Sequence, residues 1–147
     1  MKKMNKKGFS LVELIVVIAI MAVLVGVLAP ALMSNVEKSR AQKDDSAMAE
    51  VAHAVELAIA DEAAYDEVVA KLDENKKVTF SFAPSNGTVT IASAVATADY
   101  PKLLSELQTQ IGTEVKLTSK THRAQTYTVV IDMSGTAVKV TGSWPTT

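Results

Sequence analysis

Two histidines, His53 and His122, are the side chains of this sequence best suited to proton transfer or metal binding near neutral pH. They lie far apart in the chain, and neither has the i, i+4 partner or the cysteine cluster of a typical metal site. Ser, Thr and Asp are common, but they form no nucleophile elbow, phosphate loop or paired-carboxylate signature. We therefore expect no enzyme activity, no cofactor and no metal, with His53 on the flank of an amphipathic helix and His122 in a loop.

Two further motifs have simpler structural explanations. The stretch Asn86-Gly87-Thr88 matches the N-glycosylation sequon, but Asn-Gly is also the commonest pair in a tight hairpin turn. The segment 119–123 carries two cations without the interleaved aromatic residues of single-strand binders. With 15 Lys and Arg against 16 Asp and Glu, the whole chain has no basic excess. We expect a surface loop at 119–123 and no specific nucleic-acid partner.

The most unusual position in the sequence is Glu13, a carboxylate directly before a long apolar run. No charged residue occurs from Leu14 to Val36, and the first 20 or so of these positions are apolar apart from Gly26 and Pro30. Such a run is long enough to span a bilayer as a helix, and the four Lys before residue 8 place the N-terminus in the cytoplasm. The pattern predicts a single-pass membrane protein with its N-terminus inside.

An ordinary secretory signal peptide is the alternative to a retained membrane helix. A Lys-rich start, an apolar stretch from Leu14 to Leu28 and the tripeptide Ala29-Pro30-Ala31 satisfy its pattern. Two features favour retention: the carboxylate of Glu13 at the mouth of the run, and a helical pattern that continues past Ala31. A cleaved secretory signal explains neither feature.

The sequence Lys-Gly-Phe-Ser-Leu-Val-Glu-Leu at residues 7–14 resembles the class III signal of type IV prepilins and pseudopilins. The resemblance covers about the first thirty residues. It implies that a membrane peptidase cuts after Gly8, that the new N-terminal Phe9 is methylated, and that Glu13 is the fifth residue of the mature chain. Pro30 lies where the family has a helix-kinking proline.

A physical argument for Glu13 is independent of that resemblance. A carboxylate near hydrocarbon costs about 2.5 to 3.5 kcal/mol on insertion scales, so Glu13 needs a partner. The nearest cation after cleavage is the amine of Phe9. Alternatively, Glu13 lies close enough to the membrane surface to stay hydrated.

The residues after Pro30 predict a mixed domain. Residues 31–60 contain no Gly or Pro and place a set of apolar residues at helical spacing, namely Val36, Met48, Val51, Val55, Ala58 and Ile59. Charged residues of this segment, including Asp44 and Asp45, are assigned to solvated faces, with pairing between subunits along a filament as the alternative. Further helices are expected at about 63–72 and 101–111, the latter with Pro101 at its start and Gly112 after its end.

The period-two segments rich in Val, Thr and Ile predict strands at 78–82, 88–91, 114–118, 125–132 and 136–141. An Asn-Gly turn joins the first two. The sequence therefore predicts an α+β fold in which a long N-terminal helix packs on an antiparallel sheet of about four or five strands. The expected divisions are a leader at 1–8, a transmembrane and filament-core helix at 9–30, and a headgroup at 31–147.

The resemblance implies a structural subunit of a type IV pilus-like filament that serves adhesion, motility or aggregation. Its partners would be copies of itself, the prepilin peptidase and methyltransferase, the assembly platform and the membrane. The subunit would lie in the cytoplasmic membrane before assembly and in a surface pilus afterwards. A pseudopilin of a secretion or DNA-uptake system is the second possibility, and a secreted binding protein or enzyme is the third. With no Cys, the disulfide of many related pilins is impossible here.

Overall fold

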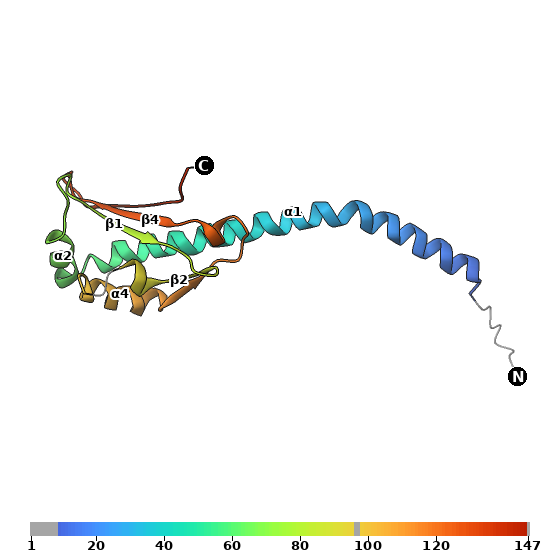
Figure 1. The fold of residues 1–147 in the computed structure, drawn as a ribbon, viewed down its shortest axis with the longest axis horizontal. Coiled ribbons are helices and arrows are strands. Elements are labelled where there is room, and N and C mark those ends of the chain that lie inside the picture. Colours follow the sequence, from blue (N-terminus) through green and yellow to red (C-terminus); the bar gives the residue numbers. More distant parts are fainter. Residues whose placement is uncertain (1–8, 96–97, 147) are drawn as a thin grey trace, which may run out of the picture. The chain divides into compact units, whose positions relative to one another are not determined.

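The computed structural model describes residues 9–95 and 98–146. The chain forms two compact units, which divide between Glu37 and Lys38. Helix α1, Leu11–Ala58, contributes its first part to one unit and its last part to the other (Figure 1). The remaining helices and all strands belong to the second unit, which is the headgroup described below.

The last part of α1 contributes one buried stripe to the headgroup. Met48, Val51, Val55 and Ala58 are almost completely buried, and their alternating spacing of three and four places them on one helix face. Ile59 directly follows and is buried too. The predicted stripe is confirmed from Met48 onward, whereas Val36 is exposed.

Carboxylates fix the start of both surface helices. Helix α2, Glu62–Val69, begins after Asp61, whose Oδ1 accepts the N–H groups of Ala63 and Ala64 at 3.0 and 3.1 Å. Helix α4, Pro101–Ile111, has Pro at its first turn and ends at Gly112. The N–H groups of residues 102 and 103, which have no acceptor within α4, donate to the carboxylate of Glu67 from α2 at 3.0 to 3.1 Å. A side chain of one helix therefore caps the next.

In the part of the chain that the structure describes, five strands form two antiparallel sheets. Strands β1 (Lys77–Phe82), β4 (Tyr127–Asp132) and β5 (Lys139–Ser143) pair in the order β1-β4-β5. Strands β2 (Thr88–Thr90) and β3 (Glu114–Lys116) form a separate pair. The one-turn helix α3, Ile91–Ala94, directly follows β2 in the sequence. The α+β class is confirmed, with the strands divided between two sheets.

The predicted Asn-Gly turn is present. Asn86 and Gly87 have φ of 51° and 78°, and Ser85 and Thr88 exchange two backbone hydrogen bonds of 2.8 and 3.0 Å around them. The strands on either side do not pair with each other, however: β1 pairs with β4, and β2 pairs with β3. This pairing places Phe80 and Phe82 of β1 on the same buried face as the inward residues of β4.

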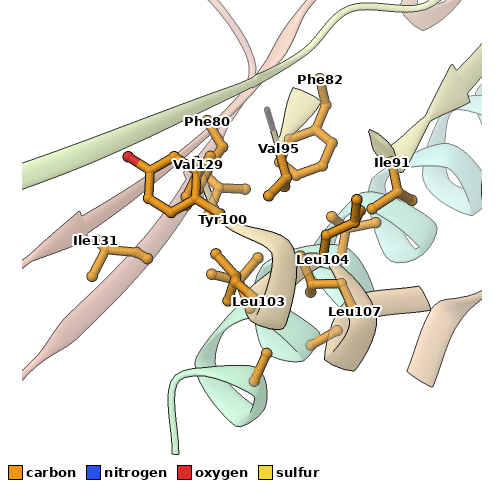
Figure 2. Packing of buried hydrophobic residues seen from close by; sticks show 14 of the residues in the cluster. Phe80, Phe82, Ile91, Val95, Tyr100, Leu103, Leu104, Leu107, Val129 and Ile131 are labelled. Atoms are coloured by element: carbon orange, nitrogen blue, oxygen red, sulfur yellow. The ribbon is translucent and has the colours of Figure 1, made fainter. Parts of the chain in front are cut away.

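The sheet face and α4 enclose the headgroup core (Figure 2). Phe80 meets Tyr100 edge to face, with ring centroids 5.1 Å apart. The core also holds three leucines of α4 together with Val129 and Ile131 of β4. The buried stripe of α1 belongs to the same cluster, so the core joins α1, the first strand, α4 and the late strand.

Gly142 in β5 leaves room for a buried aromatic ring, which gives a testable prediction. A Cβ at this position would lie 2.1 Å from Oη of Tyr127, so Gly142→Ala must displace that ring. We expect a loss of about 1 to 3 kcal/mol in unfolding free energy, as for overpacked cores. Denaturant unfolding of Gly142→Ala alone and combined with Tyr127→Phe measures it. The double variant should recover part of the loss, and equal stability of Gly142→Ala and wild type would contradict the prediction.

Candidate functional site

Helix α1 begins with a capping box formed by Ser10 and Glu13. The Ser10 Oγ accepts the N–H of Val12 at 3.3 Å, and the Glu13 Oε2 accepts the N–H of Ser10 at 2.9 Å. The first helical bond runs from the N–H of Leu14 to the Ser10 carbonyl at 3.2 Å. The reciprocal pair satisfies two backbone donors that a helix start otherwise leaves open. Glu13 therefore has a partner within its own chain.

The predicted processing residues lie just before this helix start. Gly8 is outside the described residues, whereas Phe9 precedes the helix and is 84 % exposed. In the chain as it stands, Phe9 contributes a peptide N–H and not an amine. The expected pair of Glu13 with an amine on Phe9 can form only after cleavage. The roles of Gly8, Phe9 and Glu13 in processing and assembly stay predictions.

The first part of α1 exposes a continuous apolar surface. Every large apolar side chain from Phe9 to Val36 is at least 41 % exposed. By length and composition, this helix can cross a membrane. Among soluble proteins an apolar surface of this extent is unusual and marks a contact with membrane or protein.

The helix continues through Gly26 and Pro30, the two positions expected to weaken it. Both lie inside α1, and a Cβ added at Gly26 would meet nothing within 4 Å. Pro30 lacks the N–H that would bond to the carbonyl of Gly26 four residues before it, so one helical bond is lost at this pair. The kink stays a prediction.

We expect the helix to bend or lose its regular form at Gly26 and Pro30 when subunits pack into a filament. Gly lowers the cost of leaving helical geometry, and Pro removes a bond that would oppose it. A density map of the filament measures the backbone at these residues. An uninterrupted straight helix from Leu14 to Val36 in that map would contradict the prediction, and Gly26→Ala with Pro30→Ala should straighten it.

Asp44 binds the headgroup part of α1 to the chain after β3. Its side chain is 1 % exposed, and its two oxygens accept the backbone N–H groups of Thr118 and Ser119 at 2.7 to 3.0 Å. The hydroxyl of Thr118 donates to the same carboxylate at 3.2 Å. The sequence-based assignment of Asp44 to a solvated face is wrong. A carboxylate can occupy this buried position because backbone donors replace its water.

The environment of Asp44 affects its protonation. Burial alone would raise the pKa of this carboxyl, but the hydrogen bonds from Ser119 and Thr118 outweigh burial and hold the pKa below its ordinary value. The carboxylate is therefore the favoured form in the folded headgroup.

Asp45, the next residue, contributes to a clip on the C-terminal segment. The Trp144 indole Nε1–H donates to Asp45 Oδ1 at 2.8 Å, and the same indole stacks on the ring of His122 at 4.1 Å and 3°. Tyr127 packs edge-on against Trp144 at 4.9 Å. These contacts, from Asp45, His122, Tyr127 and Trp144, are called the aromatic clip below. They attach the chain after β5 to α1 and β4.

The expectation of a surface loop at 119–123 is confirmed for Lys120, Thr121 and Arg123, which are exposed, and is wrong for the other two residues. Ser119 and His122 are buried, the latter within a short 3₁₀ turn at His122–Ala124. The His122 Nδ1 is buried and has no hydrogen-bond partner among the described residues. The other ring nitrogen, Nε2, lies 3.5 Å from Asp45 Oδ1. His122 is a packing residue of the clip.

The other potential chemical groups are dispersed. Residues 9–95 and 98–146 contain no group of three or more His, Asp or Glu placed to hold a metal ion. His53 is exposed and lies 3.4 Å from Glu56 on the same helix. A groove of about 430 Å³ runs past it, lined by Glu50, His53, Ala54, Leu57, Gln110 and Ile111. None of these side chains forms a nucleophile and base pair.

Sequence reasoning missed Ser10, Asp44 and Trp144. Ser10 carried a readable signal, because Ser-x-x-Glu before an apolar run is the pattern of a capping box. Asp44 lies one turn before Met48 on the buried stripe, which is a weaker signal. The partners of Trp144 lie far away in the sequence, and no local pattern indicates them.

The geometry of the helix start agrees with comparisons to known proteins. Residues 3–29 match the model of the prokaryotic N-terminal methylation motif. The chain is also 37 % identical over 91 residues to prepilin peptidase-dependent protein A of Clostridium perfringens. The matched residues cover 61 % of this chain and 59 % of that relative. The match thus spans a little over half of the relative's length. No solved structure matches the chain.

The N-terminal segment therefore defines a class of protein: one whose methylation motif includes the first part of a helix able to cross a membrane. The two matches together support a type IV pilin-like family for this chain.

Proposed function

We propose that this chain is a structural subunit of a type IV pilus-like extracellular filament and has no catalytic activity. The observation that carries the proposal is the exposed apolar part of α1. The Glu13 carboxylate caps the start of this helix, and the same helix continues into a folded headgroup. A surface of this kind needs lipid before assembly and other helices afterwards. The methylation motif supports the same role.

Processing precedes assembly in this proposal. A prepilin peptidase cuts after Gly8 and the amine of Phe9 is methylated. The uncut subunit is held in the cytoplasmic membrane by α1, with four Lys on the cytoplasmic side. The assembled protein is on the cell surface, and the partners are other copies of the chain and the platform that assembles them.

The test is the mature N-terminus together with a search for filaments. Intact mass and N-terminal sequencing should give a chain that starts at Phe9 and carries one extra methyl group. Immuno-electron microscopy of the producing cells should show surface filaments that disappear when the gene is deleted. A start at Leu32 would identify an ordinary secreted protein, and a methylated Phe9 without surface filaments would identify a pseudopilin.

The headgroup should fold without its membrane segment, because its core lies wholly between Lys38 and the C-terminus. We expect a truncated chain that begins at Ala31 to be soluble and monomeric, and to give a cooperative thermal transition by circular dichroism. A reducing agent should not change that transition, since the chain has no Cys. Insolubility of every truncation that begins between Ala31 and Val36 would contradict a self-contained headgroup.

A further inference from the structure

The capping box has a consequence for the peptide bond that lies just before it. In an α-helix each N–H donates to the carbonyl four residues earlier. If α1 began one turn earlier, the N–H of Val12 would bond to the carbonyl of Gly8. In the structure that N–H donates to Ser10 Oγ at 3.3 Å. The Ser10 hydroxyl therefore takes the donor that would otherwise engage the Gly8 carbonyl.

Glu13 reinforces this helix start. Its Oε2 accepts the N–H of Ser10 at 2.9 Å, so that N–H is not available to bond to the carbonyl of a preceding helical turn. The Leu14 N–H donates to the Ser10 carbonyl at 3.2 Å, the first helical bond of α1. Phe9 and Ser10 accordingly lie outside the helix, and the helix begins at Leu11.

We propose that Ser10 is a positioning residue for removal of the leader, an inference that rests on the proposed function. Hydrolysis adds water across the Gly8–Phe9 bond, releasing the Gly8 carboxylate and the Phe9 amine. A peptidase must reach the Gly8 carbonyl and bind the backbone on both sides of it, which a hydrogen-bonded helix prevents. By making the helix begin at Leu11, the Ser10 hydroxyl keeps the Val12 N–H from a helical bond to that carbonyl.

The membrane makes the hydroxyl more important than in water. Near lipid there is little water to replace a lost side-chain acceptor. A helix N–H is then best stabilised by a bond to the backbone carbonyl four residues earlier. Ala is the best helix former and a poor N-cap, so Ser10→Ala favours a helix that extends toward the leader. Asp and Thr are good N-caps with different side-chain shapes, and they should preserve the helix start.

The test is the rate of leader removal from full-length precursor in cells, followed by pulse-chase labelling and sequencing of the product. We expect Ser10→Ala to be cut about fivefold more slowly, the factor that corresponds to loss of one N-cap. Ser10→Asp and Ser10→Thr should be cut within about twofold of the wild-type rate. Ile15→Ala, an exposed apolar change one turn further on, is the matched control and should behave as wild type.

A second measurement reports the helix start directly. In full-length chain held in detergent micelles, the Cα chemical shifts of Phe9 and Ser10 should move toward helical values in Ser10→Ala and stay in place in Ser10→Asp. Wild-type processing of Ser10→Ala would overturn the inference, as would equal slowing of Ser10→Ala and Ser10→Asp, which would indicate direct side-chain recognition. A wild-type chain that is not cut after Gly8 would instead overturn the proposed function.

Discussion

Replacing Glu13 by Leu is expected to leave the chain in the membrane and processed after Gly8, yet to abolish all or nearly all filaments. Removing a carboxylate from the edge of the bilayer lowers the insertion cost by about 2.5 to 3.5 kcal/mol, so insertion should be as good or better. Ser10 still caps Val12, which preserves most of the helix start. In the proposed filament, neighbouring helices would enclose the carboxylate, which would pair with the amine of Phe9 and set the axial offset between subunits, so assembly should fail without it.

The capping box provides a variant that separates charge from helix capping. Glu13→Gln keeps an oxygen that can accept the Ser10 N–H, and Gln is a normal member of a capping box, but it has no charge. If the charge pair governs assembly, Glu13→Gln should also give few or no filaments, with Glu13→Asp intermediate. Filaments are counted by electron microscopy, and processing is checked on the same samples. Wild-type filament numbers in Glu13→Leu or Glu13→Gln would show that the charge pair is not needed.

Replacing Asp44 by Ala is expected to lower the unfolding free energy of the headgroup by about 3 kcal/mol. The substitution removes the acceptor of the part-buried N–H of Thr118 and of the buried N–H of Ser119, and unmet buried donors cost about 1 to 3 kcal/mol each. Asp44→Asn keeps one acceptor oxygen and should lose less. Denaturant unfolding at pH 7, in the truncated chain that begins at Ala31, measures the unfolding free energy of both variants. Asp66→Asn, an exposed change in α2, is the matched control and should stay within about 0.5 kcal/mol of wild type.

Acid should remove the contribution of Asp44 in a defined direction. The folded state holds the pKa of this carboxyl below its ordinary value of 3.8, so its contribution is fully present above that value and is lost as the pH falls below it. Asp132 acts in the same direction, because the Ser134 hydroxyl and N–H, together with Lys77, lower its pKa to about 2. Stability should therefore fall below about pH 4 and fall less steeply in Asp44→Asn. An unchanged acid slope in that variant would contradict the assignment.

Local signals allowed much of the headgroup to be predicted. Pro101 and Gly112 mark the ends of α4, and strands were predicted within a few residues of all five observed ones. The pairing of β1 with β4 could not be predicted, since it depends on which inward faces meet in the core and not on the Asn-Gly turn that follows β1. Short-range patterns define elements, whereas their partners are chosen by packing over long sequence separations.

The candidate site divides in the same way. The pattern of Ser10 and Glu13 is local, and it could have been read as a capping box before the structure was known. Asp44 and Asp45 look alike in the sequence, yet one is buried and the other half-exposed, because only Asp44 is in phase with Met48 and Val51. The donors to Asp44 lie more than 70 residues away, and those from the backbone N–H groups of Thr118 and Ser119 have no side-chain signature.

The aromatic clip determines how the end of the headgroup responds to mechanical load. Strand β5 lies at the edge of its sheet, and the segment after it is held by ring packing and by one hydrogen bond from Trp144 to Asp45. Such contacts can be pulled apart and can reform unaided, whereas a broken disulfide needs an oxidant or an isomerase to be restored. A headgroup closed in this way can open under tension and recover when the tension is released, independently of the redox state of its surroundings.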